Sequence, residues 1–251
     1  MNKKELNAYW KEEEQKPFSG WDFSYLHGRM VLEKLPWSYE LRAVELMRQS
    51  STMLDMGTGG GELLLSLKKD WPQKVTATET YPPNYKLAGE RLKPFGVKVF
   101  DVPLGDNDKM PFKDGEFDLI INRHSGFNPA EISRILAQGG VFFTQQVHGL
   151  NTYDLQLQFG AKSQFPNATP ENYLPKLKKA GLTIINSRDW SGKLSFSDVG
   201  ALVYYLKAIP WVVPGFSVEM HLKHLLFLQQ RLENGHSLTY TLKQYFIEAR
   251  K

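Results

Sequence analysis

A glycine-rich turn at residues 54–62, which read LDMGTGGGE, is the segment of the chain best suited to hold a ligand. Gly57, Gly59 and Gly61 have no Cβ, so the backbone can turn sharply there and come close to a bound molecule. A strand before such a turn and a helix after it would aim the free N–H groups of the helix into a crevice at the carboxyl end of a sheet. The turn therefore predicts a ligand-binding loop.

The acid at the end of this turn argues against a dinucleotide. The fingerprint G-x-G-x-x-G, counted from Gly57, requires glycine or alanine at position 62, and Glu62 stands there. A carboxylate beside a pyrophosphate would repel it. We therefore expect that this loop does not bind NAD.

Three further segments follow the turn in order. Glu79 ends an apolar run 24 positions after Asp55, residues 106–118 read DNDKMPFKDGEFD, and residues 131–140 read EISRILAQGG. Together with the spacing Asp55-x-Gly57-x-Gly59-x-Gly61, these segments resemble the motifs of class I S-adenosylmethionine (SAM)-dependent methyltransferases. The resemblance covers about residues 51–147 and is closest to the methyltransferase type 11 group.

The resemblance implies that the chain binds SAM and releases S-adenosylhomocysteine. SAM has no phosphate and carries an ammonium, a carboxylate and a sulfonium cation, so acids near the loop favour it. In this family Glu79 would accept hydrogen bonds from the ribose hydroxyls, and Asp106 with the amide that follows would hold the adenine edge. The cofactor-binding residues implied by the resemblance are Asp55, Gly57, Thr58, Gly59, Gly61, Glu79, Thr80, Asp106, Asn107 and Asn122.

Methyl transfer from a sulfonium is an in-line displacement, so holding the two reactants in line can supply most of the catalysis. A base is required only if the acceptor must lose a proton. His124, in the segment Asn122-Arg123-His124-Ser125 after the fourth expected strand, and His148, after the fifth, are the candidate bases because histidine titrates near neutral pH. Either could equally be a histidine that hydrogen-bonds a loop. We predict no metal site, since His221 and His224 lie one turn apart without further ligands.

Short apolar runs alternate with helical patterns, which predicts a parallel sheet. We expect an α/β fold: a Rossmann-like, doubly wound, mostly parallel seven-stranded sheet with helices on both faces and a helical cap. The expected strands cover residues 51–56, 74–78, 97–102, 117–122, 140–147, 182–190 and 238–249. The expected helices cover residues 38–49, 61–70, 84–92, 130–137, 169–180, 198–209 and 217–232.

The flanks suggest a cap on one core domain. Residues 1–37 form an N-terminal aromatic cap segment, 38–190 the SAM-binding core, 191–235 a helical cap insertion, and 236–251 the last strand of the core sheet. Gly20 and Gly28 bracket residues 21–27, so we expect a lid at residues 10–30 that becomes protected when the cofactor binds.

Composition limits the class of function. The 31 basic and 27 acidic residues give a net charge of +4, which is too mild to predict a nucleic-acid partner. The chain has no cysteine, which excludes disulfides and cysteine nucleophiles. The most apolar stretch, residues 201–216, is broken by Lys207 and two prolines, and residues 1–15 do not read as a secretory signal, so we expect no membrane span and a cytoplasmic location.

We therefore expect a methyltransferase acting on a small-molecule acceptor. Three alternatives stay open: an RNA or protein methyltransferase, which would need a contiguous basic surface; a SAM-binding regulatory protein without turnover; and an aminopropyl transferase, which would need an acidic polyamine site. Asn122 is not followed by Pro-Pro-aromatic, so methylation of exocyclic base amines loses support.

Overall fold

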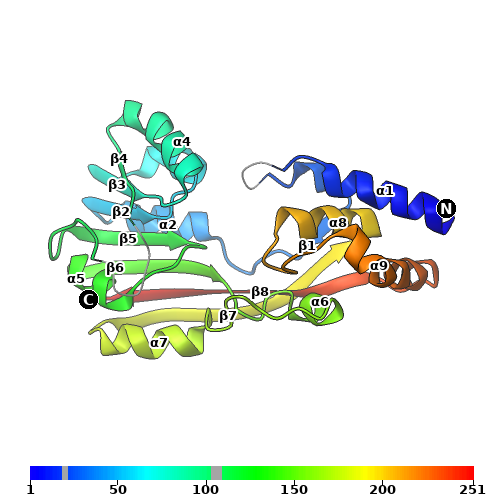
Figure 1. Cartoon of the computed structure of the whole chain (residues 1–251). Coiled ribbons are helices and arrows are strands. Elements are labelled where there is room, and N and C mark those ends of the chain that lie inside the picture. The colour runs from blue at the N-terminus through cyan, green and yellow to red at the C-terminus, as the bar shows by residue number, and fades with distance from the viewer. Residues whose placement is uncertain (19–21, 103–108) are drawn as a thin grey trace. The chain divides into compact units, whose positions relative to one another are not determined.

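The computed structural model describes residues 1–18, 22–102 and 109–251, and these divide into two compact units. Unit 1 comprises Met1–Leu35, Gly149–Pro166 and Trp190–Lys243, and unit 2 comprises Pro36–His148, Asn167–Asp189 and Gln244–Lys251. The glycine-rich turn belongs to unit 2. Two long strands, β7 (Thr183–Phe196) and β8 (Leu238–Arg250), contribute residues to both units (Figure 1).

The sheet has eight strands in the described residues, in the order β1-β7-β8-β6-β5-β2-β3-β4, rather than the seven expected. The additional strand is β1 (Met30–Leu32), which pairs antiparallel with the end of β7 in unit 1. The other strands are β2 (Thr52–Met56), β3 (Lys74–Thr78), β4 (Lys98–Phe100), β5 (Phe117–Arg123) and β6 (Leu136–Val147). β2 to β6 pair in parallel, and β8 runs antiparallel to β6, so the expected mostly parallel α/β fold is confirmed.

Apolar side chains cover both faces of the parallel strands in unit 2, because successive side chains of a strand point to opposite faces. Met53 of β2 lies in the core beneath α2 (Tyr39–Met47), α3 (Glu62–Ser66) and α4 (Pro82–Leu92). Its neighbour Leu54 lies in the opposite core, beneath α5 (Pro129–Ile135) and α7 (Pro170–Lys179). Helices on both faces explain why these strands are apolar almost throughout.

Polar residues begin most helices where the sequence predicts a start. Ser38 accepts a hydrogen bond from the N–H of Leu41 and caps α2, and Thr169 caps α7 ahead of Pro170. In unit 1, Asp198 caps α8 (Val199–Ala208) and Ser217 caps α9 (Val218–Glu233). The expected helix at 61–70 is shorter than predicted, because after α3 the chain tightens into a 3-10 helix at Lys68–Asp70. Two further 3-10 helices cover Ser24–Leu26 and Lys93–Phe95.

Unit 1 contains two helices that the sequence pattern did not predict, α1 (Lys3–Gln15) and α6 (Tyr153–Gln158). A capping box starts α1: Asn2 accepts hydrogen bonds from the N–H groups of Lys4 and Glu5, and the Glu5 carboxylate accepts one from the N–H of Asn2. Trp10 of α1 is fully buried in the core that α1 shares with α8 and α9. The strand expected at 182–190 continues to Phe196, because Leu194 and Phe196 alternate inward with period two.

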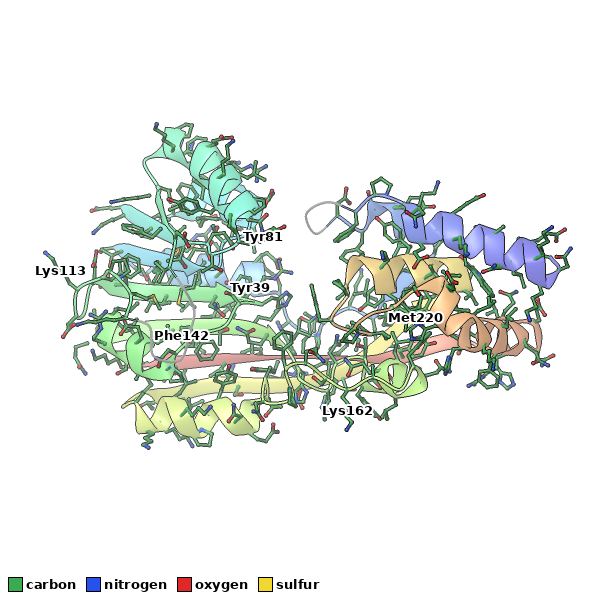
Figure 2. All side chains as sticks on the ribbon, in the orientation of Figure 1. Tyr39, Tyr81, Lys113, Phe142, Lys162 and Met220 are labelled. Carbon is green, nitrogen blue, oxygen red and sulfur yellow. The ribbon has the colours of Figure 1, made fainter. Side chains whose placement is uncertain are left out.

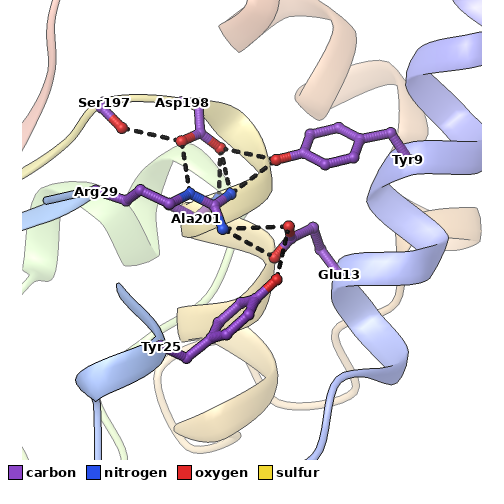
Figure 3. A network of polar contacts seen from close by, with 7 residues as sticks. All are labelled: Tyr9, Glu13, Tyr25, Arg29, Ser197, Asp198 and Ala201. Carbon is purple, nitrogen blue, oxygen red and sulfur yellow. Dashed lines mark hydrogen bonds and ion pairs between the residues drawn. The ribbon is translucent and has the colours of Figure 1, made fainter. Parts of the chain in front are cut away.

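A network of charged and phenolic side chains also ties unit 1 together (Figure 3). Arg29 donates hydrogen bonds to Asp198 and Glu13 and to the Tyr9 hydroxyl, and Tyr25 donates to Glu13. Glu13 is buried, and these donors supply the hydrogen bonds that a buried carboxylate requires. The network joins α1, the segment before β1 and the start of α8.

None of the helices in the described ranges combines the length and apolar character needed to cross a lipid bilayer.

Candidate functional site

The glycine-rich turn adopts the conformation that its glycines predict. Gly57, Gly59 and Gly61 have φ angles of 69°, 62° and 81°, in the left-handed region that favours glycine. A Cβ on Gly57 would also lie 2.4 Å from the Cβ and Oγ of Ser125, so glycine lets the loop after β5 pack directly against the turn. The turn therefore joins the carboxyl ends of β2 and β5.

The N–H groups of the turn are used within the protein. Gly57 and Thr58 donate to Thr78, at 3.3 Å to its Oγ1 and 2.9 Å to its carbonyl oxygen, and Gly59 donates to Oε2 of Glu79 at 2.8 Å. In a dinucleotide-binding loop such N–H groups would face the pyrophosphate. Here a carboxylate occupies the Gly59 donor, which is consistent with the prediction that this loop does not bind a phosphate.

Glu79 is buried at the carboxyl end of β3 and accepts three backbone hydrogen bonds. Besides the bond from Gly59, its Oε1 accepts from the N–H groups of Thr80 and Tyr81, at 2.9 and 2.8 Å. A carboxylate offers about four accepting positions. One position, on Oε2, thus stays available for a ribose hydroxyl in this conformation. Thr80 contributes its N–H to holding Glu79 in place.

Asp55, on β2, is a buried carboxylate close to Glu79. Burial raises the pKa of Asp55 from 3.8 to about 6, the Thr58 hydroxyl lowers it, and the charge of Glu79 raises it. A cation placed beside the two acids would relieve this repulsion. Glu62, the acid that argued against a dinucleotide, instead pairs with Arg91 of α4, which also donates to the carbonyl oxygen of Gly60.

Asn122 lies at the end of β5 on the face opposite to Asp55. Its side chain is fully buried, donates to the carbonyl oxygen of Met56 at 3.3 Å, and accepts from Thr144 at 2.7 Å and from Gln146. Gln146 also donates to the carbonyl oxygen of Ser125 at 2.8 Å. These bonds hold the loop after β5 in position, so Asn122 supports the site from beneath, and its contact with a cofactor remains a prediction.

His124 follows β5 with a φ of 57°, a left-handed conformation that is uncommon for a residue other than glycine. Gln145 of β6 accepts a hydrogen bond from the indole N–H of Trp37, donates to Gln244, and places its amide nitrogen 3.3 Å from Nε2 of His124. Because the oxygen of the Gln145 amide accepts from Trp37, its nitrogen is the atom that faces His124. That nitrogen donates, so Nε2 of His124 is the acceptor.

The His124 ring is held in its neutral form. Desolvation by the surrounding protein atoms lowers the pKa of His124, Arg123 lowers it further, and Gln244 and Glu40 oppose the shift. The residue as a whole remains exposed, so water moderates the effect. His124 is therefore neutral near pH 7, but it must exchange its bond to Gln145 before Nε2 can take a proton from an acceptor.

His148 lies one residue beyond β6 and is buried with its ring edge-on to Tyr245, the ring centres 6.0 Å apart. The structure thus places the two candidate bases in different surroundings, one beside Gln145 and the other against an aromatic ring. Asp106 and Asn107 lie outside the described residues. Within the described ranges no three His, Asp or Glu side chains are grouped so that they could hold a metal ion.

Two residues that the sequence analysis did not assign join this edge of the sheet. Tyr39, the first residue of α2, stacks on Phe143, with ring centres 5.0 Å apart, and the guanidinium of Arg123 lies 5.7 Å from the centre of the Tyr39 ring. Tyr39 and Tyr81 lie toward one end of the strands of unit 2, and Lys113, which precedes β5, toward the other (Figure 2). The only sequence signal for Arg123 is its place beside His124.

The edge of the sheet fits a cofactor with both charges of an amino acid. Two buried side-chain donors at this edge, the Tyr39 hydroxyl and Nε of Arg123, have no hydrogen-bond partner among the described residues. Buried polar groups are normally paired, so the donors of Tyr39 and Arg123 call for an acceptor. Unpaired donors together with two buried acids suit a ligand that carries both a carboxylate and an ammonium, as SAM does.

Comparison with known proteins assigns this region to a domain type. Residues 54–144 match the family model described as a methyltransferase domain. The demethylmenaquinone methyltransferase of Thermus thermophilus is 31% identical over 109 residues, which are 39% of this chain and 49% of that protein. The chain thus matches about half the length of this relative.

Solved structures share the fold at low identity. A protein of unknown function from Deinococcus radiodurans R1 superimposes with a TM-score of 0.59 at 13% identity and covers 99% of both chains. A protein from Bacillus halodurans C-125, named as a candidate methyltransferase, gives a TM-score of 0.58 at 17% identity, over 84% of this chain and 96% of its own. These likenesses confirm the expected Rossmann-like α/β fold.

Proposed function

We propose that this chain, whose residues 54–144 form a class I SAM-dependent methyltransferase domain, transfers the methyl group of SAM to a small-molecule acceptor. The observation that carries the proposal is the bond from the Gly59 N–H to the buried Glu79 carboxylate. This bond supports the proposal because it occupies one N–H group of the loop, and because Glu79 would accept a ribose hydroxyl there. A phosphate-free nucleoside fits this arrangement.

The residues around the turn divide the work of holding SAM. Glu79 would bind the ribose, Asp55 would attract a cationic group, and Gly57, Gly59 and Gly61 let the backbone approach the ligand. Bound SAM supplies an electrophilic methyl group on its sulfonium. The protein's part is then to orient the acceptor and to exclude water.

His124 is the candidate base for an acceptor that must lose a proton. Its ring is neutral near pH 7 and lies on the loop that packs against Gly57 through Ser125. Gln145 orients the ring through its hydrogen bond to Nε2. His148, directly after β6, is the second candidate.

Two observations support a small-molecule acceptor. The net charge of +4 comes from nearly balanced basic and acidic residues, whereas nucleic-acid partners call for a concentrated basic surface. The relative from Thermus thermophilus is named for a small-molecule acceptor, demethylmenaquinone.

A methyl-transfer screen with radiolabelled SAM tests the proposal. The purified chain is incubated with separate small-molecule, RNA and protein fractions of a cell lysate, and the Glu79→Ala variant serves as the control. We expect label to enter the small-molecule fraction and the control to lose it. Label in RNA or protein would favour the macromolecular alternative, and binding of SAM without label in any fraction would favour a regulatory protein.

A further inference from the structure

We infer that Tyr39 and Arg123 bind the carboxylate at the amino-acid end of SAM, and that Arg123 thereby selects SAM over its decarboxylated form. The inference rests on the proposed function and extends it to a specificity-determining residue. It bears directly on the choice between methyl transfer and aminopropyl transfer, because an aminopropyl donor lacks this carboxylate.

Strand periodicity places Arg123 on the same face of the sheet as the acids of the site. Met53, Ala77 and Ile121 all lie in the core beneath α2. Asp55, Glu79 and Arg123 each follow one of these residues by two positions, so they point to that face. Tyr39 belongs to the same core and covers the face from α2.

Strand order places Arg123 beyond the glycine turn, on the side away from Glu79. β2 pairs with β3 on one side and with β5 on the other, and Met56 at the end of β2 is level with Thr78 and Asn122. A ligand with its ribose at Glu79 that crosses the turn therefore reaches the end of β5. Arg123 is the last residue of that strand.

Arg123 and Tyr39 offer two donors that lack acceptors. Nε of Arg123 and the hydroxyl of Tyr39 are both buried without a hydrogen-bond partner among the described residues. The nearest ion-pair contact of Arg123 is Nη1 to Glu40, at 3.7 Å, between two partly exposed side chains. Phe143 fixes the ring of Tyr39 by stacking on it. A carboxylate would satisfy both donors, one of them through a charge-assisted bond.

Asp55 supplies the complementary charge. The Tyr39 hydroxyl lies in the field of both groups: burial raises the pKa of Tyr39, Asp55 raises it further, and Arg123 opposes this. An acid and a guanidinium that both act on one phenol match the ammonium and carboxylate of an amino acid. Removing the ligand carboxylate would leave the donors of Arg123 and Tyr39 unpaired again, which is the costly outcome.

Calorimetry with two ligands tests the inference without any need for an acceptor. S-adenosylhomocysteine and its decarboxylated analogue, which keeps the amine, are titrated into the full chain and its variants. We expect the full chain to prefer S-adenosylhomocysteine by roughly tenfold to a hundredfold, the range for hydrogen bonds to a charged group. Arg123→Gln should remove most of this preference by weakening S-adenosylhomocysteine alone, and Tyr39→Phe should weaken it by roughly tenfold.

Arg48→Gln is the matched control, since Arg48 ends the same helix as Tyr39 and its exposed side chain pairs with Asp70. It should leave both affinities unchanged, and thermal unfolding of each variant confirms that it is folded. Equal weakening of both ligands by Arg123→Gln, or an unchanged preference, would overturn the inference. Failure of the full chain to bind S-adenosylhomocysteine at all would instead contradict the proposed function.

Discussion

Burial in the folded chain disfavours the charged form of the Asp55 carboxyl group. Its pKa is raised from 3.8 to about 6, first by burial and then by Glu79, against the Thr58 hydroxyl. The folded chain therefore binds this proton more tightly than the unfolded chain. The stability that the group contributes is fully present below pH 3.8 and is lost as the pH rises through 6.

Asp55→Asn removes this charge and should stabilise the chain at neutral pH. We expect the free energy of unfolding to rise by about 1–3 kcal/mol at pH 7, from a shift of about two pKa units. The gain should fall to less than half at pH 4.5, where Asp55 is largely protonated in the folded state. Urea unfolding of both chains at the two pH values measures this, and an equal gain at both would rule out the raised pKa as its cause.

Glu79→Ala should affect both binding and folding. Loss of the carboxylate removes the acceptor for the ribose, which we expect to weaken S-adenosylhomocysteine by roughly 1.5–3 kcal/mol. The structure adds a second effect, because the N–H groups of Gly59, Thr80 and Tyr81 lose their acceptor. The free energy of unfolding should fall by about 1–3 kcal/mol. Calorimetry and urea unfolding measure the two, and an unchanged affinity would show that the ribose lies elsewhere.

At the scale of elements, one ion pair anchors α2, the helix that carries Tyr39. Arg42 donates two hydrogen bonds, at 2.9 and 2.7 Å, to the carboxylate of Glu248, whose side chain is only 3% exposed. Breaking a buried pair leaves an uncompensated charge, although the partial exposure of Arg42 lets water reduce the cost. Arg42→Ala should therefore lower the free energy of unfolding by about 1–3 kcal/mol.

A double variant separates the ion pair from simple packing. Arg42→Leu with Glu248→Leu replaces both charges by apolar groups, which is often neutral or stabilising for a buried pair. We expect urea unfolding to return close to that of the unchanged chain. A double variant as unstable as Arg42→Ala would mean that packing, and not the unpaired carboxylate, sets the cost.

The sequence pattern predicted the elements wherever it was local and strong. Runs of five or six residues expected as strands became β2, β3 and β5, and the caps Ser38 and Thr169 begin helices as expected. The charged helix α1 was not predicted, because its buried apolar residues, such as Trp10, are few and stand among many charges. Its capping box became evident only in the structure. β1 has only three residues, and its pairing depends on a distant partner, Phe196.

Some residues of the candidate site were likewise predictable from the sequence, and others were not. The glycine turn and Glu79 could be found from spacing, because the residues that bind backbone groups there are close in sequence or follow a known motif. The placement of Tyr39 and Gln145 could not, because each depends on a contact between β6 and residues 37–39, far apart in the chain. The face on which Asn122 lies follows from the register of β5 against β2, which only the structure supplies.

Unit 1 is built from three separate segments of the chain, and Arg29 links the first of them to the third. Arg29 bonds to Glu13 of α1 and to Asp198 at the start of α8. The expected lid at residues 10–30 stays a prediction, but Trp10 and Leu26 are buried in unit 1. We therefore expect protection of Trp10 and Leu26 in the free protein as well.

Arg29→Gln should destabilise unit 1 and leave unit 2, which contains the glycine turn, unchanged. Breaking this pair leaves the Glu13 charge buried, which should cost about 2–4 kcal/mol. Hydrogen exchange should rise together in residues 3–15 and 199–208 and stay unchanged in residues 52–56 and 117–123. Arg231→Gln, an exposed arginine of α9, is the control. Equal deprotection of both units by Arg29→Gln would show that they unfold as one.

We predict that the glycine turn binds a phosphate-free adenosine cofactor. Isothermal calorimetry of the full chain with S-adenosylhomocysteine and, separately, with NAD tests it most directly. Because Glu79 occupies the Gly59 donor and lies beside Asp55, we predict that S-adenosylhomocysteine binds and that NAD does not. Binding of NAD more tightly than S-adenosylhomocysteine would contradict the account.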